Sequence, residues 1–120
     1  MATILVMDDE AAIRALLSTA LQSAGHTVTE ASTGLEGLKL YRQMPADLVI
    51  VDLLMPELNG LDTIMELTQE FLDIKVIAIS RVFSDEFMKK TARLLGVRQT
   101  LHKPFGIEEM LKVVRYELAH

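Results

Sequence analysis

The sequence predicts a doubly wound α/β fold: one five-stranded parallel sheet in the order 2-1-3-4-5, with helices on both faces. Three observations lead to this prediction. Short apolar runs alternate along the chain with stretches whose apolar residues recur at helical spacing. The connections between them are short, as in right-handed strand–helix–strand units. Two of the strands are only weakly apolar, and such strands belong at the edges of a parallel sheet.

The first predicted strand is Ile4–Met7, a continuous apolar run typical of a strand buried on both faces. A helix is expected next, because apolar residues follow at helical spacing: Ile13, Leu16, Leu17, Ala20, Leu21 and Ala24. Gly25 is expected to end this helix, since glycine favours the left-handed backbone found just after a helix. Residues His26–Ala31 alternate weakly and are predicted to form an edge strand.

A second helix is expected to begin at Thr33-Gly34 and to end before Pro45. Residues Leu48–Val51 form the next buried strand, which leads through Asp52 into a turn over Pro56–Gly60. The third helix should carry one apolar face, made of Leu61, Ile64, Met65, Thr68 and Phe71.

The fourth strand is predicted over Lys75–Ser80, and Ser84-Asp85-Glu86 resembles the capped start of a helix. That helix should continue through Phe87, Met88, Thr91 and Leu95 to Gly96. A short fifth strand is expected over Gln99–His102. The last helix shows apolar residues at helical spacing: Ile107, Met110, Leu111, Val114 and Leu118. The resulting order is that of flavodoxin-like folds.

Composition limits the classes of protein that fit. The 120 residues suit one domain, expected to span residues 1–120. With 50% hydrophobic and 24% charged residues, the chain should fold rather than stay disordered. A net charge of −5 disfavours nucleic-acid binding by this domain alone. There is no cysteine and no apolar leader or membrane span, so we expect a soluble cytoplasmic protein without a membrane partner.

Polar residues follow the strands at the edge where ligands bind in such folds. Asp8 and Asp9 follow the first strand, Asp52 the third, Ser80 the fourth and Lys103 the fifth. In the predicted order these strands are neighbours, so the side chains should meet in one shallow pocket. Clustered carboxylates repel one another unless a cation intervenes, and their oxygens suit Mg²⁺. An aspartate can also act as a nucleophile toward phosphorus.

The chain resembles the receiver domain of two-component response regulators over its whole length. The resemblance rests on the acidic pair Asp8-Asp9, on Asp52 in VDLLMPELNG, on Ser80 ending VIAIS and on Lys103 in KPF. It implies that Asp52 accepts a phosphoryl group from a partner histidine kinase or histidine phosphotransfer protein. Ser80 would donate its hydroxyl to a phosphoryl oxygen, and Lys103 would pair with the phosphate. No enzyme activity is implied beyond this self-directed transfer and autodephosphorylation.

The same resemblance implies a Mg²⁺ site. Asp9, Asp52 and the backbone carbonyl of Leu54 would ligate the ion, and Asp8 would hold it through water. A cis peptide is expected at Lys103–Pro104, where proline makes it tolerable. Phosphorylation would change the surface formed by the fourth helix, the fifth strand and the fifth helix, which could also form a homodimer contact.

Two positions depart from the pattern of the family, and two more bear on hydrolysis of the phosphoryl group. Thr100 stands where receivers usually carry an aromatic residue or histidine that reports phosphorylation. Arg81 follows Ser80 where a small residue is usual, and it could lie over the site or swing into solvent. Leu54 and Val82 flank the expected path of an attacking water. Because neither can orient that water, we expect slow hydrolysis of the phosphoryl group.

Alternatives remain at this point. One is a degenerate receiver that acts only as a binding module. Arg81 and Thr100 keep this alternative open, whereas the complete set of Asp8, Asp9, Asp52, Ser80 and Lys103 argues against it. A flavin-binding electron carrier shares the fold, but Asp8-Asp9-Glu10 would repel its phosphate. A hydrolase with an aspartyl nucleophile would need a different spacing of acids after the first strand and a cap domain.

Overall fold

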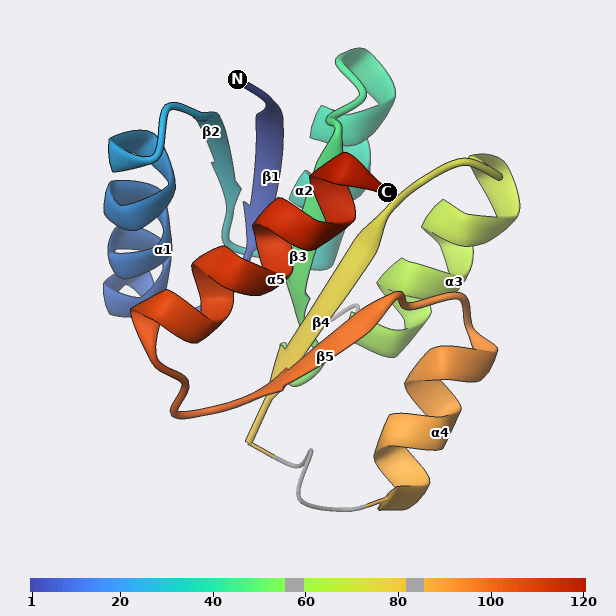
Figure 1. Ribbon diagram of the computed structural model, residues 1–120. Helices are drawn as coiled ribbons and strands as arrows, with labels where there is room; N and C mark the ends of the chain where they lie inside the picture. Colours follow the sequence, from blue (N-terminus) through green and yellow to red (C-terminus); the bar gives the residue numbers. More distant parts are fainter. Residues whose placement is uncertain (56–59, 82–85) are drawn as a thin grey trace.

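The computed structural model describes residues 1–55, 60–81 and 86–120. Strands and helices alternate throughout (Figure 1). The strands are β1 (Thr3–Met7), β2 (Thr27–Ala31), β3 (Leu48–Asp52), β4 (Val76–Ser80) and β5 (Gln99–His102). The helices are α1 (Ala11–Ser23), α2 (Gly34–Gln43), α3 (Gly60–Glu70), α4 (Glu86–Leu94) and α5 (Ile107–Ala119). The turn expected at Pro56–Asn59 and the cap expected at Ser84-Asp85 lie outside the described residues.

The five strands form one parallel sheet in the order β2-β1-β3-β4-β5, which confirms the predicted topology. Every residue of β3 and β4 is buried, whereas β2 and β5 at the edges carry exposed positions. In the register, Val6 of β1 lies beside Ile50 of β3, and Val51 lies beside Ala78 of β4. The continuous apolar runs therefore mark the strands that are covered on both faces.

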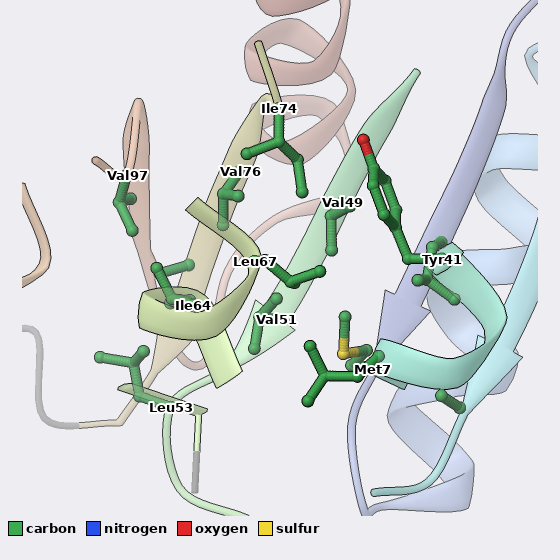
Figure 2. Packing of buried hydrophobic residues seen from close by; sticks show 14 of the residues in the cluster. Met7, Tyr41, Val49, Val51, Leu53, Ile64, Leu67, Ile74, Val76 and Val97 are labelled. Carbon is green, nitrogen blue, oxygen red and sulfur yellow. The ribbon is translucent and has the colours of Figure 1, made fainter. Parts of the chain in front are cut away.

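Helices cover both faces of the sheet. On one face, α1 and α5 pack residues such as Leu17, Leu21 and Met110 against Ile50 and Ile77. On the other, α2, α3 and α4 cover a second cluster (Figure 2) that includes Met7, Tyr41, Val51, Ile64, Leu67 and Ala92. Within the described part of the chain, no helix combines the length and the apolar character of a membrane span.

Several helix ends have the backbone geometry and capping hydrogen bonds that the sequence predicts. Gly25 and Gly96 have positive φ angles of 95° and 101°, which glycine adopts without strain. Thr33 caps α2 by accepting a hydrogen bond from the Glu36 amide at 3.1 Å. Glu36 in turn accepts one from the Ser32 amide at 2.7 Å, so two backbone donors are satisfied at this end.

The buried faces of the helices differ in detail from the predicted stripes. Leu16, Met65 and Phe87 are exposed. Small polar residues, Ser18 on α1 and Thr63 on α3, are buried instead. A helix that lies on a sheet buries a narrow row of residues, and small side chains fit where it approaches most closely.

Two backbone features lie near the carboxyl ends of the strands. The Lys103–Pro104 peptide is cis, as the resemblance implied. Gly60, the first residue of α3, lies against the end of β3: a Cβ at this position would be 2.2 Å from the Asp52 carbonyl oxygen. Its amide donates to the Leu53 carbonyl at 3.0 Å, which fixes α3 to the end of β3.

Candidate functional site

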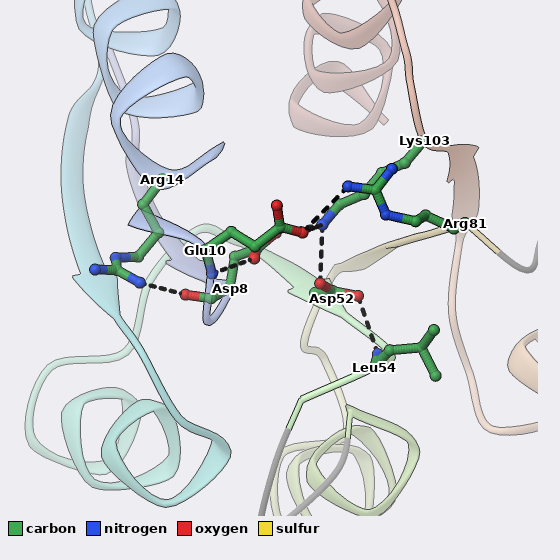
Figure 3. A network of polar contacts seen from close by, with 7 residues as sticks. All are labelled: Asp8, Glu10, Arg14, Asp52, Leu54, Arg81 and Lys103. Atoms are coloured by element: carbon green, nitrogen blue, oxygen red, sulfur yellow. Dashed lines mark hydrogen bonds and ion pairs between the residues drawn. The ribbon is translucent and has the colours of Figure 1, made fainter. Parts of the chain in front are cut away.

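Asp8, Asp52 and Lys103, three of the residues predicted to converge, meet at the carboxyl ends of the strands (Figure 3). Asp8 follows β1, Asp52 and Ser80 are the last residues of β3 and β4, and Lys103 follows β5. These four residues are buried, whereas Asp9 is exposed. The parallel strands end together, so residues far apart in the chain become neighbours.

The Lys103 ammonium joins three carboxylates. Its Nζ lies 2.9 Å from Asp8 Oδ2, 2.9 Å from Asp52 Oδ2 and 3.2 Å from Glu10 Oε1. The Lys103 side chain is only 3% exposed. Burial alone would lower the pKa of Lys103, but hydrogen bonds and charge attraction from Asp52 and Asp8 raise it above its ordinary value. Lys103 therefore stays charged, and it offsets part of the repulsion among the acids.

Asp52 has a partner on each carboxylate oxygen. Its Oδ2 accepts from Lys103, and its Oδ1 accepts from the Leu54 amide at 3.0 Å. A buried carboxylate without such partners would be strongly destabilising. The Leu54 side chain is exposed and forms an apolar wall beside Asp52.

Asp8 is fully buried beneath the site. Its Oδ1 accepts from the Glu10 amide at 2.9 Å, and its backbone carbonyl accepts from Arg14 Nη1 at 2.6 Å. Burial raises the pKa of Asp8, although the hydrogen bonds from the Glu10 amide and from Lys103 oppose this effect. The charged form of Asp8 is therefore less favourable here than in water.

Glu10 is a site residue that the sequence analysis missed. It is the N-cap of α1, yet its side chain makes no capping hydrogen bond. Instead its Oε1 faces Lys103, and Arg81 Nη2 lies 3.5 Å from the same oxygen. The hydrogen bond from Lys103, its charge and that of Arg81 together lower the pKa of Glu10. Of the two placements expected for Arg81, the structure therefore has the one at the site.

The acidic groups could hold a cation. One carboxylate oxygen from each of Asp8, Asp9, Glu10 and Asp52 lies within 4.8 Å of the others. Beside them is a cavity of about 170 Å³, lined by Asp9, Glu10, Asp52, Leu54, Arg81 and Lys103. Hard oxygen donors around a small open cavity fit Mg²⁺, which keeps several of its waters.

The remaining positions of interest lie close by. The Ser80 carbonyl accepts from the Lys103 amide at 2.9 Å, which fixes the end of β4 to the residue after β5. Thr100 pairs with Ala78 in the ladder between β4 and β5 and is half-buried. Val82, expected to flank the site together with Leu54, lies outside the described residues.

The family model of the response regulator receiver domain matches residues 4–115. The chain belongs to this family. Receiver domains accept phosphoryl groups from histidine kinases, and Mg²⁺ binding and an aspartyl phosphate are general features of the family.

Relatives of known sequence differ in length. Protein PilH of Pseudomonas aeruginosa is 33% identical over 120 residues, which cover 99% of both chains. A probable transcriptional regulator ycf27 of Porphyridium aerugineum is 37% identical over 112 residues, which cover 93% of this chain. The receiver matches only 46% of that regulator, so the chain spans about half the length of such relatives.

Solved receiver structures share the fold over nearly the whole chain. The chemotaxis protein CheY4 of Vibrio cholerae has a TM-score of 0.91 at 27% identity and covers 98% of both chains. The response regulator TrrA of Thermotoga maritima, solved in complex with Mg²⁺-BeF, has a TM-score of 0.88 at 31% identity. It covers 98% of this chain, and the match covers 99% of TrrA.

Proposed function

We propose that residues 1–120 form one phosphoacceptor receiver in which Asp52 takes a phosphoryl group from a partner histidine kinase or histidine phosphotransfer protein. The observation that best supports this is the position of Asp52. Its carboxylate lies beside an open cavity, 2.9 Å from the Lys103 ammonium and within an acidic cluster that suits a divalent cation.

The transfer needs positioning and charge neutralisation more than acid–base chemistry. An oxygen of the Asp52 carboxylate attacks the phosphorus of the donor's phosphohistidine. The O–P bond forms as the P–N bond breaks, and the imidazole leaves with the bonding electron pair and is protonated. Lys103 neutralises charge that develops on the phosphoryl oxygens, and the Ser80 hydroxyl donates to one of them.

Mg²⁺ would be held by Asp9, Asp52 and the Leu54 carbonyl, with Asp8 acting through a bound water. The ion would neutralise the negative charge of the phosphoryl group as it approaches the acids. The acidic donor set supports this assignment, as does the Mg²⁺-BeF complex of TrrA.

We further propose that phosphorylation shifts a two-state equilibrium of the segments that follow β4 and β5. The output is a changed surface over α4, β5 and α5, which could also form a homodimer contact. Such a protein would act in the cytoplasm, without nucleic-acid binding by this domain. The usual report of phosphorylation by an aromatic residue is not available, because Thr100 occupies its position.

The test is labelling with a small phosphodonor and Mg²⁺, followed by treatment with hydroxylamine, which cleaves acyl phosphates. We expect hydroxylamine-sensitive labelling of the wild type and none of Asp52→Asn. Asp47→Asn is the matched control, because it changes an exposed aspartate at the opposite end of the sheet. Labelling that survives in Asp52→Asn would refute the assignment. A folded wild type that takes no label would favour the binding module instead.

A further inference from the structure

We propose that Arg81 is a second phosphate-binding cation, which Glu10 holds at the edge of the cavity and which moves to the phosphoryl group once Asp52 carries it. This inference rests on the proposed function and assigns a role to a residue that departs from the usual pattern of the family.

The Lys103 ammonium has no free N–H donor for a phosphoryl group. An ammonium has three N–H donors, and three carboxylate oxygens already lie within hydrogen-bond distance of Lys103 Nζ, on Asp8, Glu10 and Asp52. A phosphoryl group brings three acceptor oxygens and replaces one negative charge on Asp52 with two. Lys103 can reach these oxygens only by releasing an acid, so a second cation would lower the cost of adding the phosphoryl group.

Arg81 lies close to Asp52, and its present contact with Glu10 is weak. Its guanidinium lines the same cavity as Asp52. Its only carboxylate partner among the described residues is Glu10, at 3.5 Å through one nitrogen, and its side chain is 61% exposed. Exposed ion pairs of this kind contribute little to stability, so the pair can break readily.

The guanidinium of Arg81 suits a phosphoryl group better than it suits Glu10. A guanidinium presents planar, paired N–H donors that match two oxygens of a phosphate at once, which a single carboxylate oxygen at 3.5 Å does not exploit. The phosphoryl group should therefore displace Glu10 as the partner of Arg81. Until then, the contact with Glu10 places the exposed guanidinium beside the cavity.

If Arg81 instead blocks the cavity, its removal should have the opposite effect on binding at the site. If the Arg81–Glu10 pair closed the cavity against phosphodonors, then removing Arg81 would make the site easier to occupy. If Arg81 binds phosphate, its removal should make the site harder to occupy.

The experiment measures beryllofluoride binding by calorimetry at saturating Mg²⁺, because beryllofluoride stands in for a phosphoryl group on aspartate. We expect Arg81→Ala to weaken binding about tenfold, the effect of losing hydrogen bonds to a charged group, and Arg81→Lys to weaken it less. Arg115→Ala is the control, since it removes the same charge at the opposite end of the sheet. Mg²⁺ affinity without beryllofluoride should not fall in Arg81→Ala, because a nearby positive charge is lost.

A double-mutant cycle tests whether Arg81 exchanges Glu10 for the phosphoryl group. Glu10→Gln should tighten beryllofluoride binding, and this gain should shrink in the Arg81→Ala background, because it depends on the released guanidinium. Unchanged or tighter binding in Arg81→Ala would overturn the inference while leaving the phosphoacceptor role intact. A folded wild type that binds no beryllofluoride would overturn both.

Discussion

Replacing Gly60 with alanine would put a methyl group against the backbone that carries Asp52. The added Cβ would lie 2.2 Å from the Asp52 carbonyl oxygen and 2.4 Å from Leu53 Cα. Ordinary contacts of this kind begin near 3.4 Å, so the first helical turn of α3 or the end of β3 must move by about 1 Å. Both neighbours are backbone atoms, and no rotation of a side chain can relieve the contact.

Two effects should follow from Gly60→Ala. Overpacking usually costs about 1–3 kcal/mol, against a gain of up to about 1 kcal/mol from alanine in a helix. We therefore expect the free energy of unfolding in urea to fall by about 1–2 kcal/mol. A misplacement of about 1 Å at a reacting group can slow a reaction by about 100-fold. The initial rate of Asp52 labelling by a small phosphodonor, measured per folded molecule, should fall on that scale.

Gly37→Ala is the matched control for this experiment. Its Cβ would lie 2.1 Å from Met7 Sδ, but the Met7 side chain is flexible and can turn aside. Gly37→Ala should lose less stability and keep the labelling rate per folded molecule. Wild-type stability and labelling in Gly60→Ala would refute the reasoning, and so would an equal loss of labelling in both variants.

Two further substitutions test the electrostatics and the chemistry of the site. Burial raises the pKa of Asp8 in the folded protein, so ionised Asp8 lowers the free energy of unfolding. This loss of stability is complete above the folded pKa of Asp8 and absent below the ordinary pKa of 3.8. Asp8→Asn should therefore raise the free energy of unfolding at neutral pH without Mg²⁺, and this gain should shrink as the pH falls toward 3.8. Urea titrations at several pH values measure the gain, and a gain that does not change with pH would contradict the prediction. Leu54→Asn should shorten the lifetime of phosphorylated Asp52, because an amide can orient the attacking water where the apolar Leu54 cannot. Label retention after removal of the phosphodonor measures this, and an unshortened lifetime would count against it.

The fold could be predicted because its strongest signals are local. The uninterrupted apolar run Leu48–Val51 is typical of a strand covered on both faces, and Gly25 and Gly96 mark helix ends. Which side chains of a helix face the sheet depends on how the helix packs in the folded protein. Met65 and Thr63 lie on one helix, and only the packing of α3 against its neighbours decides that Thr63 is buried and Met65 exposed.

The site was predictable in outline because strand ends in a parallel sheet converge. Asp52 and Lys103 could be placed together from topology alone. The role of Glu10 could not, because an acid at a helix start usually caps its own helix. Only the structure shows that Glu10 makes no cap bond and instead contacts Lys103. The burial of Glu117 on α5 was not predictable from the sequence either, although its side chain accepts a hydrogen bond from Gln99 at 2.9 Å.

The slight burial of α4 has a consequence for the dynamics of the domain. Of the described residues of this helix only Ala92 is fully buried, whereas Phe87 and Leu94 face solvent. Detaching α4 would expose much less apolar surface than opening β3 or β4. Its amides should therefore exchange with solvent deuterium through local openings that leave the central strands closed. The domain thus places its least buried helix next in the chain after β4, the strand that ends beside the acidic site proposed to accept the phosphoryl group.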